Sequence, residues 1–292
     1  MISVVVVTYN SIAHIDECLK SLGGLERIVV DNASADGSAD ASRRAGAIVI
    51  ANPENRGFAA AANQGIEAAS GDVVLLLNPD TVLLDGFDAL QAQLARPSVF
   101  AAAGVLVDGD GRPQVGFTVK RLPTFWSLAF EALGLNGVWP NNPVNRRYRG
   151  LDLDLSVKQE VEQPPGACLA FRKSVWRELG GFDERFYPLW FEDVDFCRRL
   201  KEDGLSIVFE PRCRFRHYGA HSLASVGFTD HQLFWYRNLL YYVRKNGGFG
   251  AALLMRLMIS AGAGARMTVF VLRGDLSRAR AFGAVIRMAS TE

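Results

Sequence analysis

Short apolar runs alternate with helix-like stretches over the first hundred residues, and this pattern leaves few folds open to the chain. Residues 2–7 form a continuous apolar run, as expected for a strand buried on both faces, and residues 13–22 indicate a helix. The same order recurs over residues 27–30, 38–45, 47–51, 59–69 and 72–77. Such alternation is typical of βαβ units around a mostly parallel sheet. We therefore predict an α/β fold in which helices flank a central sheet.

Polar residues follow each of these predicted strands. They are Thr8, Tyr9 and Asn10 after the first strand, Asp31 and Asn32 after the second, residues 52–55 after the third, and Asn78, Pro79 and Asp80 after the fourth. Open α/β sheets bind ligands beyond the carboxyl ends of their strands. The four loops are therefore expected to surround one crevice.

The predicted crevice lacks the usual phosphate-binding sequences. No G-x-G-x-x-G follows the first strand, and the chain has no P-loop lysine motif. Asp31 stands at the tip of the second strand, where its carboxylate can accept hydrogen bonds from a base N–H or from ribose hydroxyls. Asp31 and Asn32, followed by Ser34 and Gly37, are equally good turn residues, so a structural role for Asp31 stays open.

Asp80 follows the strongest candidate for a buried strand, residues 73–77, and should stand at the mouth of the sheet. Mg²⁺ and Mn²⁺ favour oxygen ligands, and they commonly bridge one or two carboxylates to phosphate oxygens. Asp80 is therefore a candidate metal ligand. The alternative is a turn around Pro79 in which Asp80 caps the next segment.

Three acids cluster beside aromatic residues over residues 190–195, at the start of a predicted helix. Trp190 and Phe191 can offer an apolar platform to a sugar, while a neighbouring carboxylate, Asp193 or Glu192, takes a proton from a hydroxyl. The helix macrodipole also stabilises acids in a first turn, so these acids equally fit a helix start without catalytic duty.

His217 follows a strand predicted over residues 206–209 and is a candidate neutral nitrogen ligand for the same metal. A hydrogen-bonded loop histidine is the structural alternative. His221, four residues later, is a second candidate that spacing alone does not exclude.

The second half of the chain is organised differently. Residues 108–111 indicate a hairpin turn, and residues 112–164 lack a clear period, so we expect irregular structure there that forms part of a binding surface. Order is expected to return at residues 167–171, 173–179 and 192–202.

Composition narrows the function classes. The chain has 32 Lys and Arg against 31 Asp and Glu, so no bulk attraction to nucleic acid is expected. Its four cysteines form no C-x-x-C pair, which favours reduced thiols in a cytoplasmic protein. The apolar run 2–7 is too short for a signal peptide and lacks a basic flank, so no secretion is expected.

The residues from 230 onward indicate helices in which arginines are mixed with aromatic side chains. Arg256 and Arg266 cut the apolar stretch 249–272 into pieces shorter than the ~20 residues needed to cross a bilayer. The pattern suits peripheral contact with the anionic inner face of the plasma membrane. It equally suits packing on a protein core.

Six motifs lie in order over about residues 2–225. They are Val7-Thr8-Tyr9-Asn10, Val30-Asp31-Asn32-Ala33-Ser34, Asn55-Arg56-Gly57-Phe58 with Asn63, Asn78-Pro79-Asp80, Gly180-Gly181-Phe182-Asp183 and Phe191-Glu192-Asp193-Val194-Asp195. Together they resemble glycosyltransferase family 2, and most closely its bacterial rhamnosyltransferase-like branch.

The resemblance implies a GT-A fold, an inverting mechanism, a divalent cation (Mg²⁺ or Mn²⁺) and a sugar donor linked to dTDP or UDP. It implies transfer of a sugar to a saccharide or polyprenyl-linked acceptor in cell-surface polysaccharide synthesis, and the branch resemblance favours rhamnose as that sugar. By position, Asp80 matches the last acid of the family's D-x-D motif, although Asn78 replaces the first. His217 resembles the histidine that completes metal coordination, and Asp193 matches the catalytic base. The positions that resemble donor contacts are Thr8, Tyr9, Asn10, Asp31, Asn32, Asn63, Asn78 and Asp80.

On this resemblance, residues 1–108 form the nucleotide-sugar-binding half and residues 109–228 the acceptor-binding and catalytic half of one GT-A domain. Residues 229–292 form a C-terminal amphipathic helical region. Two other function classes stay open: a sugar-nucleotide nucleotidyltransferase, and a non-catalytic protein that binds sugar nucleotides or membranes. The first lacks a Gly-rich, basic loop between Thr8 and Leu22, and the intact Asp80, Asp193 and His217 argue against the second.

Overall fold

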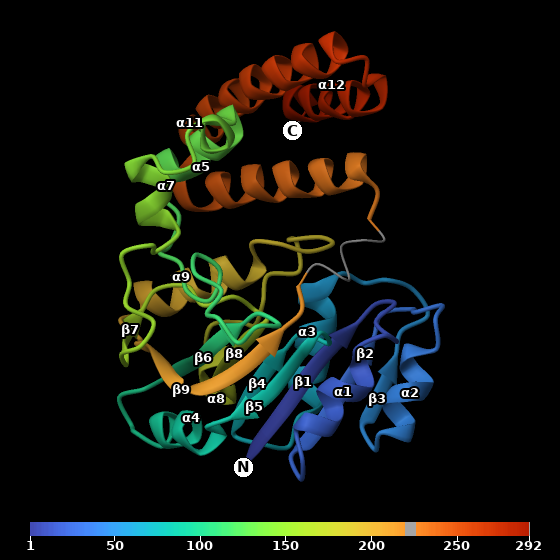
Figure 1. Cartoon of the computed structure of the whole chain (residues 1–292), viewed down its shortest axis with the longest axis vertical. Helices are drawn as coiled ribbons and strands as arrows, with labels where there is room; N and C mark the ends of the chain where they lie inside the picture. The colour runs from blue at the N-terminus through green and yellow to red at the C-terminus, as the bar shows by residue number, and fades with distance from the viewer. Residues whose placement is uncertain (220–225, 292) are drawn as a thin grey trace.

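A computed structural model gives the structure of residues 1–219 and 226–291. The sheet contains β1 Ile2–Thr8, β2 Glu26–Asp31, β3 Ile48–Ala51, β4 Val73–Leu77, β5 Thr81–Asp85, β6 Ala101–Val107, β7 Gln159–Val161, β8 Cys168–Arg172 and β9 Ile207–His217. The helices are α1 Ile15–Ser21, α2 Ser38–Arg44, α3 Phe58–Ala68, α4 Phe87–Leu94, α5 Phe125–Leu133, α6 Leu135–Val138, α7 Pro143–Tyr148, α8 Lys173–Glu178, α9 Glu192–Glu202, α11 Phe228–Leu272 and α12 Leu276–Thr291. Figure 1 shows the sheet in the lower half of the molecule, with α5, α7, α11 and α12 above it.

The strands form one mixed sheet in the order β3-β2-β1-β4-β8-β6-β9-β5, and β7 pairs with β9. β1 to β4 are parallel, as predicted from the βαβ pattern. β8 then runs antiparallel to both β4 and β6, and β5 and β7 run antiparallel to β9. The predicted α/β fold with helices around a central sheet is confirmed. β6 and β9 also pair in parallel, so the sheet mixes both directions and is less parallel than predicted.

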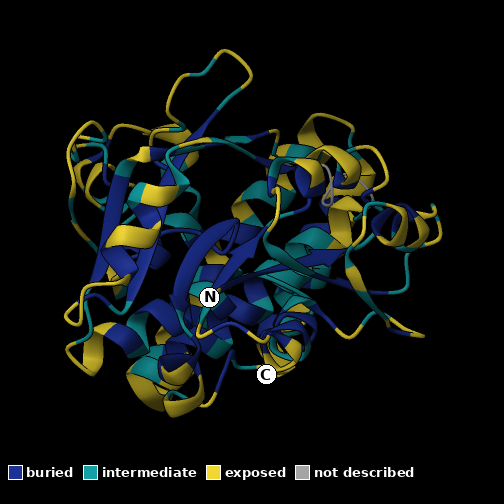
Figure 2. Ribbon diagram, turned by 90° about the horizontal axis from the view of Figure 1, so that it is seen from below, coloured by how far each residue is buried: buried dark blue, intermediate teal, exposed yellow. Residues whose placement is uncertain are grey.

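Alternate residues of the central strands enter two different cores, as the period of a strand requires. Val4 and Val6 of β1 pack with α1 and α4 on one face of the sheet. Val5 and Val7 pack with α3, α8 and α9 on the other. Figure 2 shows the strands almost entirely buried between the outer helices. The continuous apolar run 2–7 therefore arises because both faces of β1 are covered.

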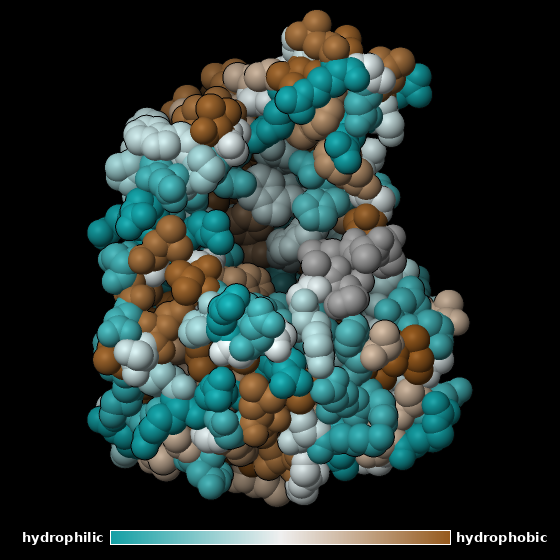
Figure 3. Space-filling model, in the orientation of Figure 1, coloured by the Kyte–Doolittle hydropathy of each residue, from teal (hydrophilic) through white to brown (hydrophobic). Residues whose placement is uncertain are grey.

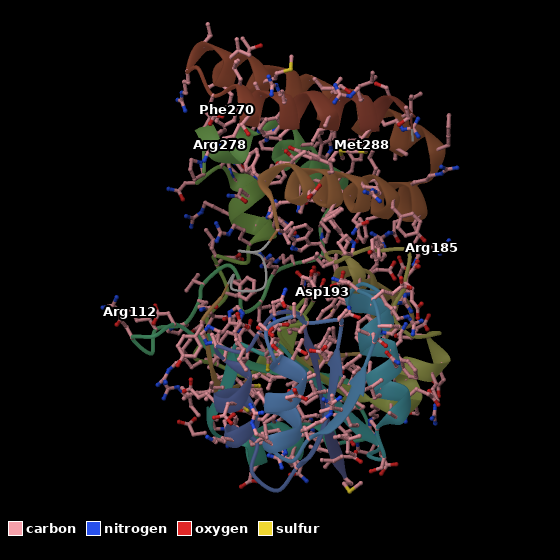
Figure 4. All side chains as sticks on the ribbon, turned by 90° about the vertical axis from the view of Figure 1, so that its right-hand side faces the viewer. Arg112, Arg185, Asp193, Phe270, Arg278 and Met288 are labelled. Carbon is pink, nitrogen blue, oxygen red and sulfur yellow. The ribbon has the colours of Figure 1, made fainter. Side chains whose placement is uncertain are left out.

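The region 112–164 is more regular than predicted, since it contains α5, α6, α7 and β7. The prediction of irregular structure was wrong here. α5 begins with a capping box in which Thr124 Oγ1 accepts from the Ser127 N–H at 3.2 Å and Ser127 Oγ accepts from the Thr124 N–H at 2.9 Å. Ser replaces the usual Glu or Gln of this motif, so the start signal is weak in the sequence. The predicted turn at 108–111 is present, with a bridge between Val107 and Pro113, and Arg112 projects away from the body in Figure 4.

α11 consists of two arms, because Gly248 has φ 75° and ψ −173° and breaks the helix. We call residues 228–247 the first arm and residues 249–272 the second arm. By length and composition α11 would be long and apolar enough to cross a membrane. The second arm instead forms a hairpin with α12 and packs on α5, burying Met255, Ile259 and Ala263. Figures 1 and 4 both place this hairpin on the side of the first arm that faces away from the sheet.

Ion pairs fix the first arm to the body that carries the sheet. Lys245 Nζ lies 2.8 Å from Asp183 Oδ2 and 2.7 Å from Asp195 Oδ1, and the Tyr241 hydroxyl donates to Asp183 Oδ2 at 2.8 Å. The side chain of Asp195 is almost fully buried, and Arg199 supplies its second positive partner at 2.9 Å. Buried carboxylates need such pairing, so Asp183 and Asp195 serve to hold the first arm in place.

Candidate functional site

A cleft of about 940 Å³ lies between the carboxyl ends of the central strands and the first arm of α11. The hollow is visible midway up the molecule in Figure 3. Its wall combines the loops after β1 and β4, the segment 187–194, the end of β9, and Phe234 and Trp235 of the first arm. The cleft therefore occupies the position at which ligands of open α/β sheets bind.

Sheet pairing brings Asp80 and His217 together. Thr81 of β5 is in register with His217 of β9, so Asp80, one residue before, lies beside the imidazole. His217 Nε2 is 3.6 Å from Asp80 Oδ1, and both side chains are almost fully buried. The rival candidate, His221, lies outside the described residues.

The tautomer of His217 follows from its other partner, Gln114. The Gln114 amide donates to the His217 carbonyl oxygen at 2.8 Å, so its Oε1, 3.0 Å from His217 Nδ1, must accept. Nδ1 therefore carries the proton, and in the neutral ring Nε2 keeps its lone pair. Burial lowers the pKa of His217, while the charge of Asp80 opposes this shift. A neutral ring thus points a lone pair towards Asp80.

This pair fits a divalent cation. Asp80 Oδ1 is buried and has no hydrogen-bond partner among residues 1–219 and 226–291. A carboxylate oxygen and an imidazole lone pair that face each other both need a positive partner. Within the same described ranges, no group of three or more His, Cys, Asp and Glu side chains gathers that could hold a metal. Asp80 and His217 could thus supply two protein ligands and leave room for phosphate oxygens and water, as Mg²⁺ usually requires.

Asp193 lies in the first turn of α9 and lines the same cleft. Figure 4 shows it between the sheet and the C-terminal helices. Its Oδ2 accepts from the Gly166 N–H at 2.9 Å, and its Oδ1 accepts from the Val194 N–H at 2.7 Å. These two bonds orient the carboxylate, while each oxygen retains a lone pair for a hydroxyl in the cleft.

Glu192 is the neighbouring acid, but its environment differs. Its side chain is buried, and Oε2 has no hydrogen-bond partner in the described part of the chain. Burial raises the pKa of Glu192 well above its usual value, and the nearby Asp193 raises it further. Glu192 therefore keeps its proton to a higher pH than an ordinary glutamate does, which makes it the poorer proton acceptor. This difference favours Asp193 over Glu192 as the base.

We expect the E192Q variant to be more stable than the wild type at neutral and alkaline pH. The unfolded pKa is near 4.5, whereas the folded pKa is raised, so folding binds a proton between these values. The stability that this proton contributes is complete below about pH 4.5 and is lost as pH rises towards the folded pKa. Thermal melts from about pH 4.5 to pH 8 should therefore show an advantage of E192Q that grows with pH. The exposed E178Q variant is the control, and a constant difference between E192Q and wild type would contradict a raised pKa of Glu192.

The two residues just before α9 have a left-handed backbone conformation, which residues other than glycine rarely adopt. Trp190 has φ 76° and Phe191 has φ 74°. Each such residue costs about 1–2 kcal/mol, and such conformations cluster at functional sites. Trp190 is half-buried and its ring meets His231 edge-on at 4.6 Å, so it offers a surface to the cleft. Phe191 is 6% exposed and packs on Tyr242, so little of it remains for an acceptor.

The predicted donor contacts divide into cleft-wall and supporting residues. Tyr9, Asn32, Asn78 and Asp80 line the cleft. The remaining four, Thr8, Asn10, Asp31 and Asn63, are not part of the described wall.

Thr8 and Asp31 are both buried and bonded to each other. Thr8 Oγ1 donates to Asp31 Oδ2 at 2.9 Å, and Asp31 Oδ1 accepts from the Ser34 N–H at 3.0 Å. Asn10, with φ 52°, similarly accepts from the Ala35 N–H at 2.9 Å. These bonds shape the loops after β1 and β2, so in this structure the three residues support the cleft wall.

Asn32 and Asn63 each satisfy donors and acceptors within the fold. Asn32 lies at the cleft and bonds to Asn52, Asn55, Arg56 and Gly57. Asn63 bonds to Trp176, Phe182 and Glu184 at 2.8–3.1 Å, and so holds α3 against the Gly-Gly-Phe-Asp segment. The structure therefore does not bring Asn63 to the cleft.

Several cleft residues were not predicted individually. The largest group comes from the region 112–164 and consists of Gln114, Phe117, Lys120, Tyr148 and Gln163. Burial lowers the pKa of Lys120 and the charge of Asp193 raises it, and no ion pair of Lys120 occurs within the described chain. In the region 112–164, basic and aromatic residues without a helical or strand periodicity predicted a binding surface. This pattern did not identify Lys120 in particular.

Comparisons with known proteins identify the family of the chain. The profile of glycosyl transferase family 2 matches residues 3–180. The N-acetylglucosaminyl-diphospho-decaprenol L-rhamnosyltransferase of Mycobacterium tuberculosis is 32% identical over 242 residues, which cover 76% of this chain and 77% of that protein. The pre-mycofactocin glycosyltransferase of the same organism is 29% identical over 74% of this chain and 42% of its own length.

Solved structures show the same fold at low identity. A mannosyltransferase from Pyrobaculum calidifontis in complex with GDP-Man and Mn²⁺ has a TM-score of 0.55 and 19% identity, over 99% of this chain and 84% of that one. S. aureus TarS 1-349 in complex with UDP has a TM-score of 0.52 and 15% identity, over 98% and 90% of the two chains. The chain therefore belongs to glycosyl transferase family 2 and is a glycosyltransferase of the GT-A fold.

Proposed function

We propose that the chain is an inverting glycosyltransferase that moves a sugar from a nucleoside-diphosphate donor to a polyprenyl-linked saccharide. Rhamnose is the first candidate for this sugar. One observation carries this proposal: Asp193 lines the same cleft as the facing pair Asp80 and His217. The 32% identical relative is named for transfer of L-rhamnose to an N-acetylglucosaminyl-diphospho-decaprenol, which supports both the sugar and the acceptor class.

The reaction needs one displacement at the anomeric carbon of the donor. The acceptor hydroxyl gives its proton to Asp193, its oxygen forms the new glycosidic bond, and the bond to the diphosphate breaks with the electron pair leaving on the phosphate oxygen. The two backbone N–H donors from Gly166 and Val194 hold the Asp193 carboxylate in place before the proton arrives. A single in-line attack inverts the anomeric configuration.

Asp80 and His217 would hold Mg²⁺ or Mn²⁺ together with the donor diphosphate. When bound, the cation would offset the negative charge that grows on the leaving diphosphate. Lys120 adds a cation to the same cleft, and we propose that it contacts a phosphate group of either the donor or the acceptor. Trp190 and Trp235, which both line the cleft, would form the apolar wall for the acceptor saccharide.

Different parts of the chain would contribute to donor binding and to catalysis. We propose that residues 1–108 position the donor through the loops after β1, β2 and β4, while residues 109–228 supply Lys120, Asp193 and His217. Thr8, Asn10, Asp31 and Asn63 would act on the donor indirectly, by fixing these loops. Residues 229–292 cover the cleft with the first arm.

Turnover with identified products tests the function. The purified chain is incubated with dTDP-rhamnose and with UDP-sugars, a polyprenyl-diphospho-N-acetylglucosamine acceptor, and Mg²⁺ or Mn²⁺. We expect release of a free nucleoside diphosphate that depends on the acceptor, with the glycosidic bond inverted relative to the donor. Release of pyrophosphate would indicate a nucleotidyltransferase, and absence of turnover with every donor would contradict the proposal.

A further inference from the structure

The second arm of α11 exposes a continuous apolar stripe. Phe249, Leu253 and Leu257 recur every four residues and are 70%, 47% and 62% exposed. Residues at this spacing share one face of a helix. The stripe continues over residues 261, 265 and 269 to Leu272, which is 81% exposed. No exposed position of the second arm carries a charge.

This exposed face is not needed by the fold, because the opposite face of the second arm already packs in a core. Met255, Ile259 and Ala263 are fully buried against α5 and α12. Large exposed apolar faces on folded proteins usually mark an interaction surface. Figure 3 shows brown side chains gathered over the upper end of the molecule, where the second arm and α12 lie.

The same region carries an excess of positive charge. Residues 229–292 contain nine Lys and Arg against three Asp and Glu, although the whole chain has a formal charge of only +1. Arg273 directly follows the stripe, and Arg280 and Arg287 lie on α12. All three are exposed, and their side chains make no ion pair or hydrogen bond with the described residues. These cations are therefore free to meet anionic groups outside the protein.

An apolar stripe flanked by unpaired arginines matches the interface of an anionic bilayer. We propose that the second arm docks flat on such a membrane, with the leucines of the stripe among the upper acyl chains and Arg273, Arg280 and Arg287 at the phosphate headgroups. Flat docking fits the structure better than a second arm that spans the membrane, because the side chain of Arg266 is hydrogen-bonded to α5. Its guanidinium donates to the carbonyl oxygens of Glu131 and Ala132 at 2.9 Å.

Membrane docking of the hairpin would also determine where the cleft lies relative to the bilayer. The first arm forms one wall of the cleft, and the hairpin lies on the other side of the first arm. A membrane-bound hairpin would therefore hold the cleft close to the bilayer surface, where a polyprenyl-linked saccharide presents its sugar. The docking itself goes beyond the proposed function, because vesicle binding can be measured whether or not the chain transfers a sugar.

Vesicle flotation with the full chain tests the proposal. The wild type is mixed with phosphatidylcholine vesicles that contain or lack phosphatidylglycerol, and the bound fraction is measured at low and high salt. The L253E/L257E variant removes the stripe, and the R273Q/R280Q/R287Q variant removes the cations. I48E is the matched control, since Ile48 is 55% exposed on the edge strand β3. Circular dichroism melts of each variant establish that it is folded.

We expect the wild type and I48E to float with phosphatidylglycerol vesicles and to bind phosphatidylcholine alone more weakly. Losing one arginine near an anionic surface should weaken partitioning about fivefold, and losing one buried leucine about tenfold. Equal binding by the wild type and folded L253E/L257E would overturn the proposal. So would resistance of the bound chain to extraction by alkaline carbonate, which indicates spanning. A dimer that L253E/L257E converts to monomer, without any vesicle binding, would assign the stripe to a second copy and overturn it as well.

Discussion

Replacing Asp193 with Asn should lower kcat by ~10²–10⁴-fold and leave donor binding nearly unchanged, because general-base assistance contributes about that much to turnover. The amide oxygen of Asn can still accept from the Gly166 N–H, so the local fold of α9 should persist. The loss would then come from the missing proton acceptor. Initial rates with the acceptor, together with calorimetry of donor binding, measure the two quantities separately.

The control for this variant is D203N, which changes an exposed acid at the other end of α9 and should leave kcat unaltered. An equal loss of donor affinity and rate in D193N would show that Asp193 binds the donor instead of accepting the proton. A D193N enzyme with full activity would remove Asp193 from the mechanism altogether.

Replacing Asp80 with Ala should weaken metal-dependent donor binding by ~100-fold or more, since a metal ion supplies several kcal/mol of interaction with a diphosphate. The variant deletes the carboxylate that faces His217 in the cleft. Calorimetry of nucleoside-diphosphate binding, with Mn²⁺ and with a chelator, measures the effect. For the wild type we expect the chelator to reduce affinity strongly, and for D80A we expect it to change little.

D85A is the matched control, because Asp85 is an exposed acid at the far end of β5 that forms an ion pair with Arg214 at 3.5 Å. A D80A variant whose donor binding still depends on the metal would contradict the role of Asp80. Asn78, which replaces the first acid of the family's D-x-D motif, would be the next ligand to examine in that case.

Much of the first half of the fold could be predicted because its central strands, β1 and β4, are buried on both faces. Residues 2–7 are apolar without interruption for that reason, and the bounds predicted for α9 agree with the structure. β9 extends to His217, well beyond the predicted 206–209, because its outer part carries Glu210, Arg212 and Arg214, which do not resemble a buried strand. These charges are satisfied by ion pairs, as in the contact of Arg212 with Glu210 at 2.8 Å.

Site residues could be predicted where short motifs follow the ends of strands. They were harder to predict where contacts between distant parts of the sequence determine whether a side chain reaches the cleft. Asp80 and His217 were predicted as ligands of one metal and Asp193 as the base, and all three line one cleft in the structure. The position of Asn63 depends on Trp176 and Phe182, more than a hundred residues later, which local sequence does not reveal. Lys120 likewise reaches the cleft only through the packing of the region 112–164.

The most direct measurement of the central claim is a crystal structure of the chain with Mn²⁺ and a nucleoside diphosphate, in which anomalous scattering locates the metal. We predict an ion bound to Asp80 and His217 and to the diphosphate, with the Asp193 carboxylate facing the end of the diphosphate from which the sugar departs. An ion bound away from Asp80 and His217, or a nucleotide seated outside this cleft, would contradict the account.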